Sequence, residues 1–298
     1  MVVIPGTTLV CIDCQFLALA ARALMLTLAQ CEYGLVKFFT DAHAVPGLDP
    51  RVRVVPVPTI ASALDYSRFV LKHLVDHVDT DFVQVVQWDG YVTNGAAWRD
   101  EFFDYDYIGA RWWFREDGRN VGNGGFSLRS RRLLEALRDE AIKVTDAEDN
   151  AICLVHREYL ESSHGIRIAP AAVADRYSFE GTKRTGAEFG FHRAFNLPYF
   201  YGEAQLAEVL DAIPDDKFCA PVSVSLVFRL IELNRKREAL RYAKRIRAQP
   251  AYAQLPGDFR GDLERTAIYL VGRDDPCPCA SGIAFERCCG AIGKWSPV

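Results

Sequence analysis

Three features are absent from the sequence, and each absence narrows the class of protein. No run of about 18 uninterrupted apolar residues occurs, so no membrane-spanning helix is expected. There is no excess of positive charge, because the formal net charge is −4, which argues against nucleic acid as the main partner. A secretory signal is also missing: the apolar stretch FLALAARALMLTLAQ follows Asp13, has no Lys or Arg ahead of it and contains Arg22. We therefore expect a globular, cytoplasmic protein.

Cysteine is abundant, with nine residues, but disulfides are not expected without a secretory signal. Four of the nine lie close together near the C-terminal end of the sequence. The other five stand among apolar neighbours, where small buried thiols are the expected interpretation; they are Cys11, Cys14, Cys31, Cys153 and Cys219.

Strand and helix patterns alternate through the first half of the chain. The predicted strands cover residues 7–13, 33–41, 51–57 and 81–86, and the predicted helices cover residues 15–30 and 61–78. The apolar residues placed along one face of the second helix are Leu64, Phe69, Leu71, Leu74 and Val75. This alternation predicts an α/β fold with a mainly parallel, Rossmann-like sheet flanked by helices.

Three carboxylates follow predicted strands: Asp13, Asp41 and Asp89. In parallel sheets ligands bind beyond the carboxyl ends of the strands, so the three would form a negatively charged, ligand-binding edge. Alternatively, strand ends simply need polar residues that form turns.

From residue 205 the pattern becomes helical. Residues 222–234 and 237–249 predict two helices joined by a tight turn, and the second would pack through Ala239, Leu240, Ala243 and Ile246. Its basic side is either a solvated face or a docking surface for an anionic acceptor or a protein partner; it carries Arg235, Lys236, Arg237, Arg241, Lys244, Arg245 and Arg247. The predicted domains are residues 1–204, a helical appendix at 205–271 and a small tail at 272–298.

The tail sequence DPCPCASGIAFERCCG has the spacing of a structural zinc site. Its four cysteines can surround one tetrahedral Zn²⁺; they are Cys277, Cys279, Cys288 and Cys289. The segment has little core of its own, so the metal would contribute most of its folding free energy. It resembles the SEC-C motif, which is known from the SecA translocation ATPase, but differs from the usual pattern at Ala280, Ile283 and Ala284. Such a tail could also recruit a protein partner.

A glycine-rich turn lies near the middle of the chain, where Gly122, Gly124 and Gly125 surround Asn123. Glycines allow a ligand to approach the backbone closely. The following stretch FSLRSRRLLEAL predicts a helix, with Ser127 or Ser130 as its N-cap.

Five motifs occur together and in order: VVQWDGYV, YDYIGARWW, GNGGFSLRSR, AEDNAIC and EFGFH. With them, residues 7 to about 197 resemble a bacterial family of unknown function, DUF5672, which looks like a GT-A-type nucleotide-sugar glycosyltransferase. The resemblance implies a GT-A-like domain.

The resemblance also implies a cation site. A GT-A enzyme usually ends a central strand with Asp-x-Asp, whose last carboxylate binds the Mn²⁺ or Mg²⁺ that bridges the donor diphosphate. Here the triplet is Gln87-Trp88-Asp89, so Asp89 takes the metal position and Gln87 stands where ribose is contacted. His192 resembles the C-terminal histidine that completes the metal shell. Because one carboxylate is replaced, metal dependence is an open question.

The remaining implied roles concern donor and acceptor. Asp149 would be the general base and Glu148 would contact a substrate, although acids in a first helical turn also suit the helix dipole. Gly124 and Gly125 would form the wall beside the donor sugar. Trp112 and Trp113 would offer flat faces on which a sugar ring stacks, and core packing is the alternative for one of them. Lys183 and Arg184 would bind phosphate if their loop closes over the donor; the alternative is an ordinary mobile loop.

The expected activity is transfer of a sugar, hexosyltransferase-like and with inversion, from a nucleotide-diphosphate-sugar donor to a hydroxyl of a glycan, peptide or protein. A binding adaptor on the same scaffold is a rival, favoured by the missing carboxylate. Nucleotidyl transfer is a third possibility, although it normally needs more than one metal-binding carboxylate.

Overall fold

The computed structural model describes residues 1–45, 47–144, 147–270, 274, 277, 281–288 and 291, with residues 267–270 as backbone alone. Contacts between Cα atoms divide the chain into two units, Met1–Arg193 and Ala194–Val298. The boundary predicted after residue 204 lies inside the second unit. None of the described helices combines the length and apolar character needed to cross a membrane.

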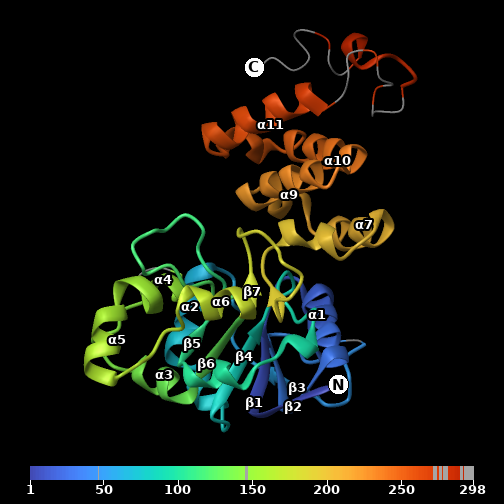
Figure 1. Ribbon diagram of the computed structural model, residues 1–298. Coiled ribbons are helices and arrows are strands. Elements are labelled where there is room, and N and C mark those ends of the chain that lie inside the picture. The colour runs from blue at the N-terminus through green and yellow to red at the C-terminus, as the bar shows by residue number, and fades with distance from the viewer. Residues whose placement is uncertain are drawn as a thin grey trace. The chain divides into compact units, whose positions relative to one another are not determined.

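A six-stranded sheet forms the centre of the first unit (Figure 1). Its strands, in spatial order, are β3 (Val52–Pro56), β2 (Cys31–Thr40), β1 (Val2–Ile12), β4 (Phe82–Val86), β6 (Ser127–Ser130) and β5 (Tyr107–Ile108). The first four run parallel, whereas β6 pairs antiparallel with both β4 and β5. The prediction of a mostly parallel α/β sheet is confirmed.

Apolar residues cover both faces of the sheet because side chains alternate along each strand. On β1, Leu9 and Cys11 enter one hydrophobic cluster, whereas Val10 and Ile12 enter the other. The first cluster includes α1 (Leu17–Gln30), and the second includes α2 (Ala63–Lys72) and α3 (Arg131–Ala136). The other helices of this unit are α4 (Glu148–Asn150), α5 (Arg157–His164) and α6 (Ala171–Tyr177).

The helix predicted over 61–78 is two elements. It consists of α2 and a 3-10 turn, η1 (Leu74–His77), and starts with a capping box in which the side chains and backbone amides of Ser62 and Asp65 pair reciprocally. Of the apolar residues placed along one face, Phe69, Leu71, Leu74 and Val75 are buried. Leu64, near the start of α2, is 44% exposed.

The helix predicted to start within FSLRSRRLLEAL was placed too early. Ser127–Ser130 form β6, and α3 begins only at Arg131, with Ser130 Oγ accepting a hydrogen bond of 3.0 Å from Leu133 N. All four β6 residues are buried and pair with β4 or β5, so sheet pairing overrides local helix preference. Of the two predicted N-caps, Ser130 is the N-cap of α3.

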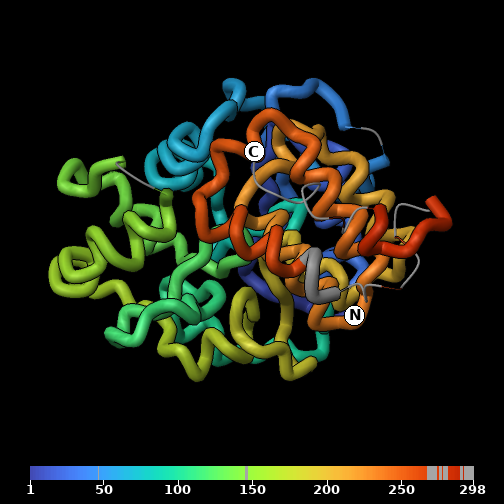
Figure 2. The backbone as a smooth tube through the Cα atoms, turned by 90° about the horizontal axis from the view of Figure 1, so that it is seen from above, coloured from blue at the N-terminus to red at the C-terminus, as the bar shows by residue number. Residues whose placement is uncertain are grey.

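The second unit is helical. Its main helices are α7 (Glu203–Asp211), α8 (Asp215–Phe218), α9 (Pro221–Glu232), α10 (Lys236–Arg247) and α11 (Gly257–Leu270). The last three pack against one another: Figure 1 shows them stacked, and in Figure 2, seen from above, they overlap. The predicted helical hairpin is confirmed as α9 and α10, with the packing residues Ala239, Leu240, Ala243 and Ile246 all buried.

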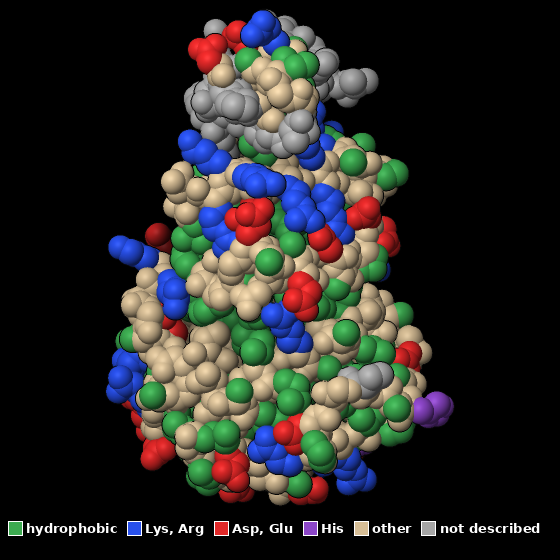
Figure 3. All heavy atoms as spheres, turned by 90° about the vertical axis from the view of Figure 1, so that its right-hand side faces the viewer, with side chains coloured by type: hydrophobic (Ala, Val, Ile, Leu, Met, Phe, Trp, Pro, Cys, Tyr) green, Lys and Arg blue, Asp and Glu red, His purple; other side chains and the backbone are tan. Residues whose placement is uncertain are grey.

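Most of the basic side of α10 is neutralised within the unit. Arg235, Arg241 and Arg245 form ion pairs with Glu238, Asp211 and Asp215, respectively. Arg237 lies 4.0 Å from Glu203. On the face shown in Figure 3, blue and red side chains accordingly lie next to one another. These pairs favour the solvated-face interpretation over an anion-docking surface.

Candidate active site

The strand order changes direction between β1 and β4, because β2 and β3 lie on one side of β1 and β4 on the other. Loops that leave neighbouring strands in opposite directions open a crevice, which is where ligands bind in such sheets. A cavity of about 180 Å³ lies there. Its lining comes from the segment after β1, the start of α2 and the end of β4: residues 12–16, Ile60, Ser62, Ala63, Tyr66, Gln87 and Trp88.

A larger hollow of about 370 Å³ lies beside the edge strand β3, between residues 56–60 and the outer side of α2 and η1. It is away from the strand-order reversal, and its lining contains none of the predicted site residues. We therefore take the smaller cavity as the candidate site, because the strand-order reversal and the predicted polar residues coincide there.

Asp89 is held in a tight turn at the end of β4. Gln87 and Gly90 exchange two backbone hydrogen bonds of 3.0 Å, which leaves Trp88 and Asp89 as the two turn residues. Asp89 is 7% exposed, so it has not slipped into solvent as an ordinary strand-end residue would. A buried carboxylate at this position needs a cationic or hydrogen-bonding partner.

The two other strand-end carboxylates have local roles. Asp13 Oδ1 accepts backbone hydrogen bonds from Gln15 (2.7 Å) and Phe16 (2.6 Å) at the start of α1. Burial raises the pKa of Asp13, and the charge of Asp89 raises it further, so these two carboxylates are electrostatic neighbours. Asp41 accepts a hydrogen bond of 2.7 Å from the Thr59 hydroxyl and is exposed, as a turn residue would be.

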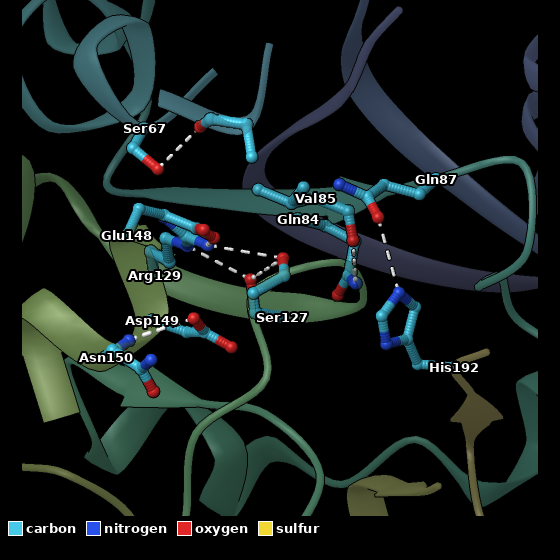
Figure 4. Close-up of polar contacts among 12 residues, drawn as sticks. Ser67, Gln84, Val85, Gln87, Ser127, Arg129, Glu148, Asp149, Asn150 and His192 are labelled. Atoms are coloured by element: carbon cyan, nitrogen blue, oxygen red, sulfur yellow. Dashed lines mark hydrogen bonds and ion pairs between the residues drawn. The ribbon is translucent and has the colours of Figure 1, made fainter. Parts of the chain in front are cut away.

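His192 meets the end of β4 from a distant part of the chain. It follows β8 (Gly190–Phe191), which pairs in parallel with β7 (Ser178–Phe179). Its Nε2 lies 3.3 Å from Gln87 Oε1 and 3.6 Å from Asp89 Oδ1 (Figure 4 draws the contact with Gln87). The structure thus brings Asp89 and His192 together. The Gln87 amide, expected at a ribose, is directed at the imidazole.

Two residues behind His192 were missed from the sequence. The buried carboxylate of Glu180 has Oε2 3.9 Å from His192 Nδ1 and accepts a 2.9 Å hydrogen bond from Arg193 Nε at Oε1. Burial would raise the pKa of Glu180, but hydrogen bonding and attraction from His192 and Arg193 outweigh it and lower the pKa. An ionised carboxylate beside Nδ1 orients a histidine and favours metal binding through Nε2.

The donor set fits an open cation site. Asp89 Oδ1 and His192 Nε2 are close enough to share one ion, and Gln87 Oε1 adds a neutral oxygen. Oxygen with imidazole suits Mn²⁺, whereas Mg²⁺ prefers oxygen alone. Among the described residues, no group of three or more His, Cys, Asp or Glu side chains could hold a metal ion. The remaining ligands would have to come from substrate and water.

Glu148 is engaged by a buried arginine. Its Oε1 accepts a 2.7 Å hydrogen bond from Arg129 Nη2, and the guanidinium also donates to Ser127 Oγ (3.0 Å) and Gly124 O (3.2 Å), as Figure 4 shows for Glu148 and Ser127. Arg129 is fully buried. The sequence did not identify Arg129 as a buried partner of Glu148, because the β6 segment had been predicted as helix. This pairing favours a structural role for the Glu148 carboxylate.

Asp149 is more accessible than Glu148. It belongs to α4, which continues into a π-helical turn, η4 (Ala151–Val155), and its Oδ1 accepts a 2.9 Å hydrogen bond from Asn150 N. Burial, aided by the negative charge of Glu148, raises the pKa of Asp149 despite the opposing effect of Arg129. A carboxylate with a raised pKa has the basicity that a general base needs.

The two predicted glycines leave room for these side chains. A Cβ on Gly124 would overlap the Glu148 carboxylate, and one on Gly125 would overlap His192 Nε2. The absence of a side chain at these two positions therefore allows Glu148 and His192 to pack closely against the backbone. Asn123, which follows Gly122 and precedes Gly124, is buried and has a φ of 66°. Neither Oδ1 nor Nδ2 of its side-chain amide has a hydrogen-bond partner among the described residues.

The other residues predicted to contact the donor lie in different surroundings. Trp112 is a buried core residue, whereas Trp113 is 51% exposed and lies against Gly181. Lys183 and Arg184 lie in the loop between β7 and β8, where Glu188 accepts backbone hydrogen bonds from Thr185 (2.5 Å) and Gly186 (2.9 Å). They are not part of the described lining of the smaller cavity.

The cysteine predictions divide into two groups. Cys11, Cys31, Cys153 and Cys219 are buried as expected, and Cys14 is half-buried. In the tail, Cys277 packs with Leu240 and Phe285, and Cys288 lies at the edge of that cluster. Cys279 and Cys289 lie outside the described residues, so the four-thiolate zinc site stays a prediction.

Comparison with known proteins agrees with both resemblances. Residues 49–194 match a family described as "Protein of unknown function (DUF5672)", and residues 274–291 match the SEC-C motif. The chain is also 20% identical over 226 residues to the protein translocase subunit SecA of Aliarcobacter butzleri (strain RM4018), an alignment that covers 74% of this chain and 25% of SecA. The chain thus spans a quarter of the length of that curated relative.

Proposed function

We propose that this protein is a glycosyltransferase that moves a sugar from a nucleotide-diphosphate donor to an acceptor hydroxyl. The observation that carries the proposal is the convergence of Asp89 and His192, 3.6 Å apart, beside the cavity at the strand-order reversal. Such a crevice suits a nucleotide, and the oxygen and imidazole donors suit a hard cation.

Each residue has a role in this proposal. Asp89 and His192 would hold Mn²⁺ or Mg²⁺, with Glu180 fixing the imidazole; the bound cation would supply charge neutralisation of the departing nucleoside diphosphate. Asp149 would take the proton from the acceptor hydroxyl as its oxygen attacks the anomeric carbon. Attack from the face opposite the leaving group would invert that carbon.

A binding adaptor is the second candidate, and the position of Gln87 favours it. A neutral amide replaces the first carboxylate and lies 3.3 Å from His192 Nε2, where it can occupy the imidazole without any cation. An adaptor would bind nucleotide sugars without metal dependence and without turnover.

The test compares thermal unfolding and donor hydrolysis with a panel of UDP- and GDP-sugars, with and without Mn²⁺. A transferase should be stabilised by nucleotide sugar in a Mn²⁺-dependent manner, because a ligand at free concentration c that binds only the native state stabilises it by RT ln(1 + c/Kd), and Mn²⁺ should lower the Kd. Asp89→Ala should lose this effect. Asp49→Ala is the matched control, because Asp49 pairs with Arg51 at 2.8 Å outside the cavity lining. Equal binding and turnover by Asp89→Ala would refute the proposal.

A further inference from the structure

Arg193 has an unusual backbone conformation directly after His192. Its φ is 77°, in the left-handed region, which it shares among the described non-glycine residues with Asn123 and Asn234. Asparagine tolerates this region, whereas a long side chain such as arginine adopts it at an energetic cost. Strained residues of this kind persist mainly where function requires a particular side-chain direction.

The guanidinium of Arg193 is held at one edge and open at the other. Its Nε donates to Glu180 Oε1 at 2.9 Å, and Glu180 is almost fully buried. The Arg193 side chain is nevertheless 48% exposed. Since a guanidinium has five N–H donors, the Nε contact leaves its two Nη groups available for a ligand.

Arg193 is also tied to the proposed cation ligand by geometry. It follows His192 directly in the chain, and the Glu180 carboxylate that accepts from Arg193 Nε at Oε1 has its Oε2 3.9 Å from His192 Nδ1. A cation ligand at His192 and a guanidinium anchored to the same carboxylate can therefore act on one phosphate-bearing ligand. An arginine fork matches phosphate oxygens in a bidentate manner.

We propose that Arg193 binds the diphosphate of the donor and stabilises the nucleoside diphosphate as it leaves. This inference rests on the proposed function and assigns to Arg193 a task that the sequence had suggested for Lys183 and Arg184. The anomeric carbon–oxygen bond breaks, and its electron pair goes to the diphosphate oxygen that Arg193 stabilises by hydrogen bonding. The acceptor oxygen forms the new bond to that carbon, and its proton goes to Asp149.

The test uses inorganic diphosphate as the probe, titrated calorimetrically into the full chain in buffer freed of Mn²⁺ and Mg²⁺ by a chelating resin, so that neither ion contributes and the zinc predicted for the tail is kept. The parent should bind, and Arg193→Ala should bind at least about ten-fold more weakly, because a charge-assisted contact is lost. Arg193→Lys should recover part of the affinity. Arg176→Ala is the matched control, since Arg176 pairs with Glu101 through two nitrogens at 3.0 and 3.1 Å and is similarly exposed.

Arg193→Gly guards against misfolding, because glycine accepts the left-handed backbone. It should fold, with the parent's far-ultraviolet circular dichroism, and still lose diphosphate binding. If folded Arg193→Gly binds diphosphate as the parent does, or if the parent does not bind it, the Arg193 proposal is overturned. Mn²⁺-dependent turnover of a nucleotide sugar in the parent would then leave the proposed function standing.

Discussion

Arg129 Nη2 lies 2.7 Å from Glu148 Oε1, and both side chains are buried. Removing one member of such a pair leaves an uncompensated buried charge. We predict that Glu148→Ala lowers the free energy of unfolding by about 3–5 kcal/mol, measured by urea denaturation. The exposed pair Arg131–Glu135, which is 2.9 Å apart, is the control: Glu135→Ala should cost at most about 0.5 kcal/mol. Equal losses would show that Glu148 is not a structural ion-pair partner.

Gly125 provides a second test, because its position leaves no room for a side chain beside His192. A Cβ there would overlap His192 Nε2 and crowd Gln87 Oε1. Gly125→Ala should therefore displace His192. The apparent affinity for nucleotide sugar in the presence of Mn²⁺, measured from thermal stabilisation, should fall at least about ten-fold. Gly34→Ala is the control, since nothing lies within 4 Å of its Cβ position. Unchanged Mn²⁺ dependence in Gly125→Ala would contradict a role for His192 at the cation.

The raised pKa of Asp149 predicts a pH-dependent stability difference. Burial and the charge of Glu148 favour the protonated carboxyl in the folded protein, so the folded chain binds more protons than the unfolded chain above the unfolded pKa. The free energy of unfolding therefore falls as pH rises from the unfolded pKa through the folded pKa. Asp149→Asn removes this loss and should be more stable than the parent at pH 7, by about 1.4 kcal/mol for each unit of pKa elevation.

That stability gain should shrink toward acid pH and vanish below the unfolded pKa, as followed by urea denaturation across a pH series. Asp149→Asn should also lose transfer activity, because an amide cannot accept the proton. Full activity in this variant would exclude Asp149 as the base, and a pH-independent stability difference would exclude the titration.

Backbone strain at Arg193 is measurable by comparing two variants that both lack the side chain. The free energy of unfolding of Arg193→Gly should be about 1 kcal/mol higher than that of Arg193→Ala, because a φ of 77° is unfavourable for alanine and not for glycine. The same pair of substitutions at Arg176, within α6, should show the opposite order, since glycine weakens a helix interior. No advantage for Arg193→Gly would mean that the position is unstrained.

The tail is predicted to bind zinc. Full-length protein should contain about one Zn²⁺ per chain, and Cys277→Ser or Cys288→Ser should lose it, since a structural site needs all four thiolates. Cys219→Ser is the control, because Cys219 is a buried thiol that contacts Ile246 O at 3.7 Å. Zinc retention after substitution of either tail cysteine would contradict the four-cysteine site.

The sequence predicts the four parallel strands of the sheet well because each of them carries its own apolar run and polar end. It misses β6, whose residues become a strand only through pairing with β4, a tertiary effect that local pattern does not contain. Asp89 was singled out by its place at a strand end and by motif resemblance, and His192 by motif resemblance alone. Glu180, Arg129 and Arg193 were not, since each acquires its role from a fold-imposed neighbour: His192, Glu148 and Glu180, respectively.

The most direct measurement is pulsed electron paramagnetic resonance of Mn²⁺ bound to the protein with a nucleoside diphosphate. If Asp89 and His192 hold the cation, the parent should show nitrogen coupling from the imidazole, and His192→Gln should lose it. Asp89→Ala should lose most bound Mn²⁺. Bound Mn²⁺ without nitrogen coupling in the parent, or no Mn²⁺ binding at all, would contradict the proposed cation site.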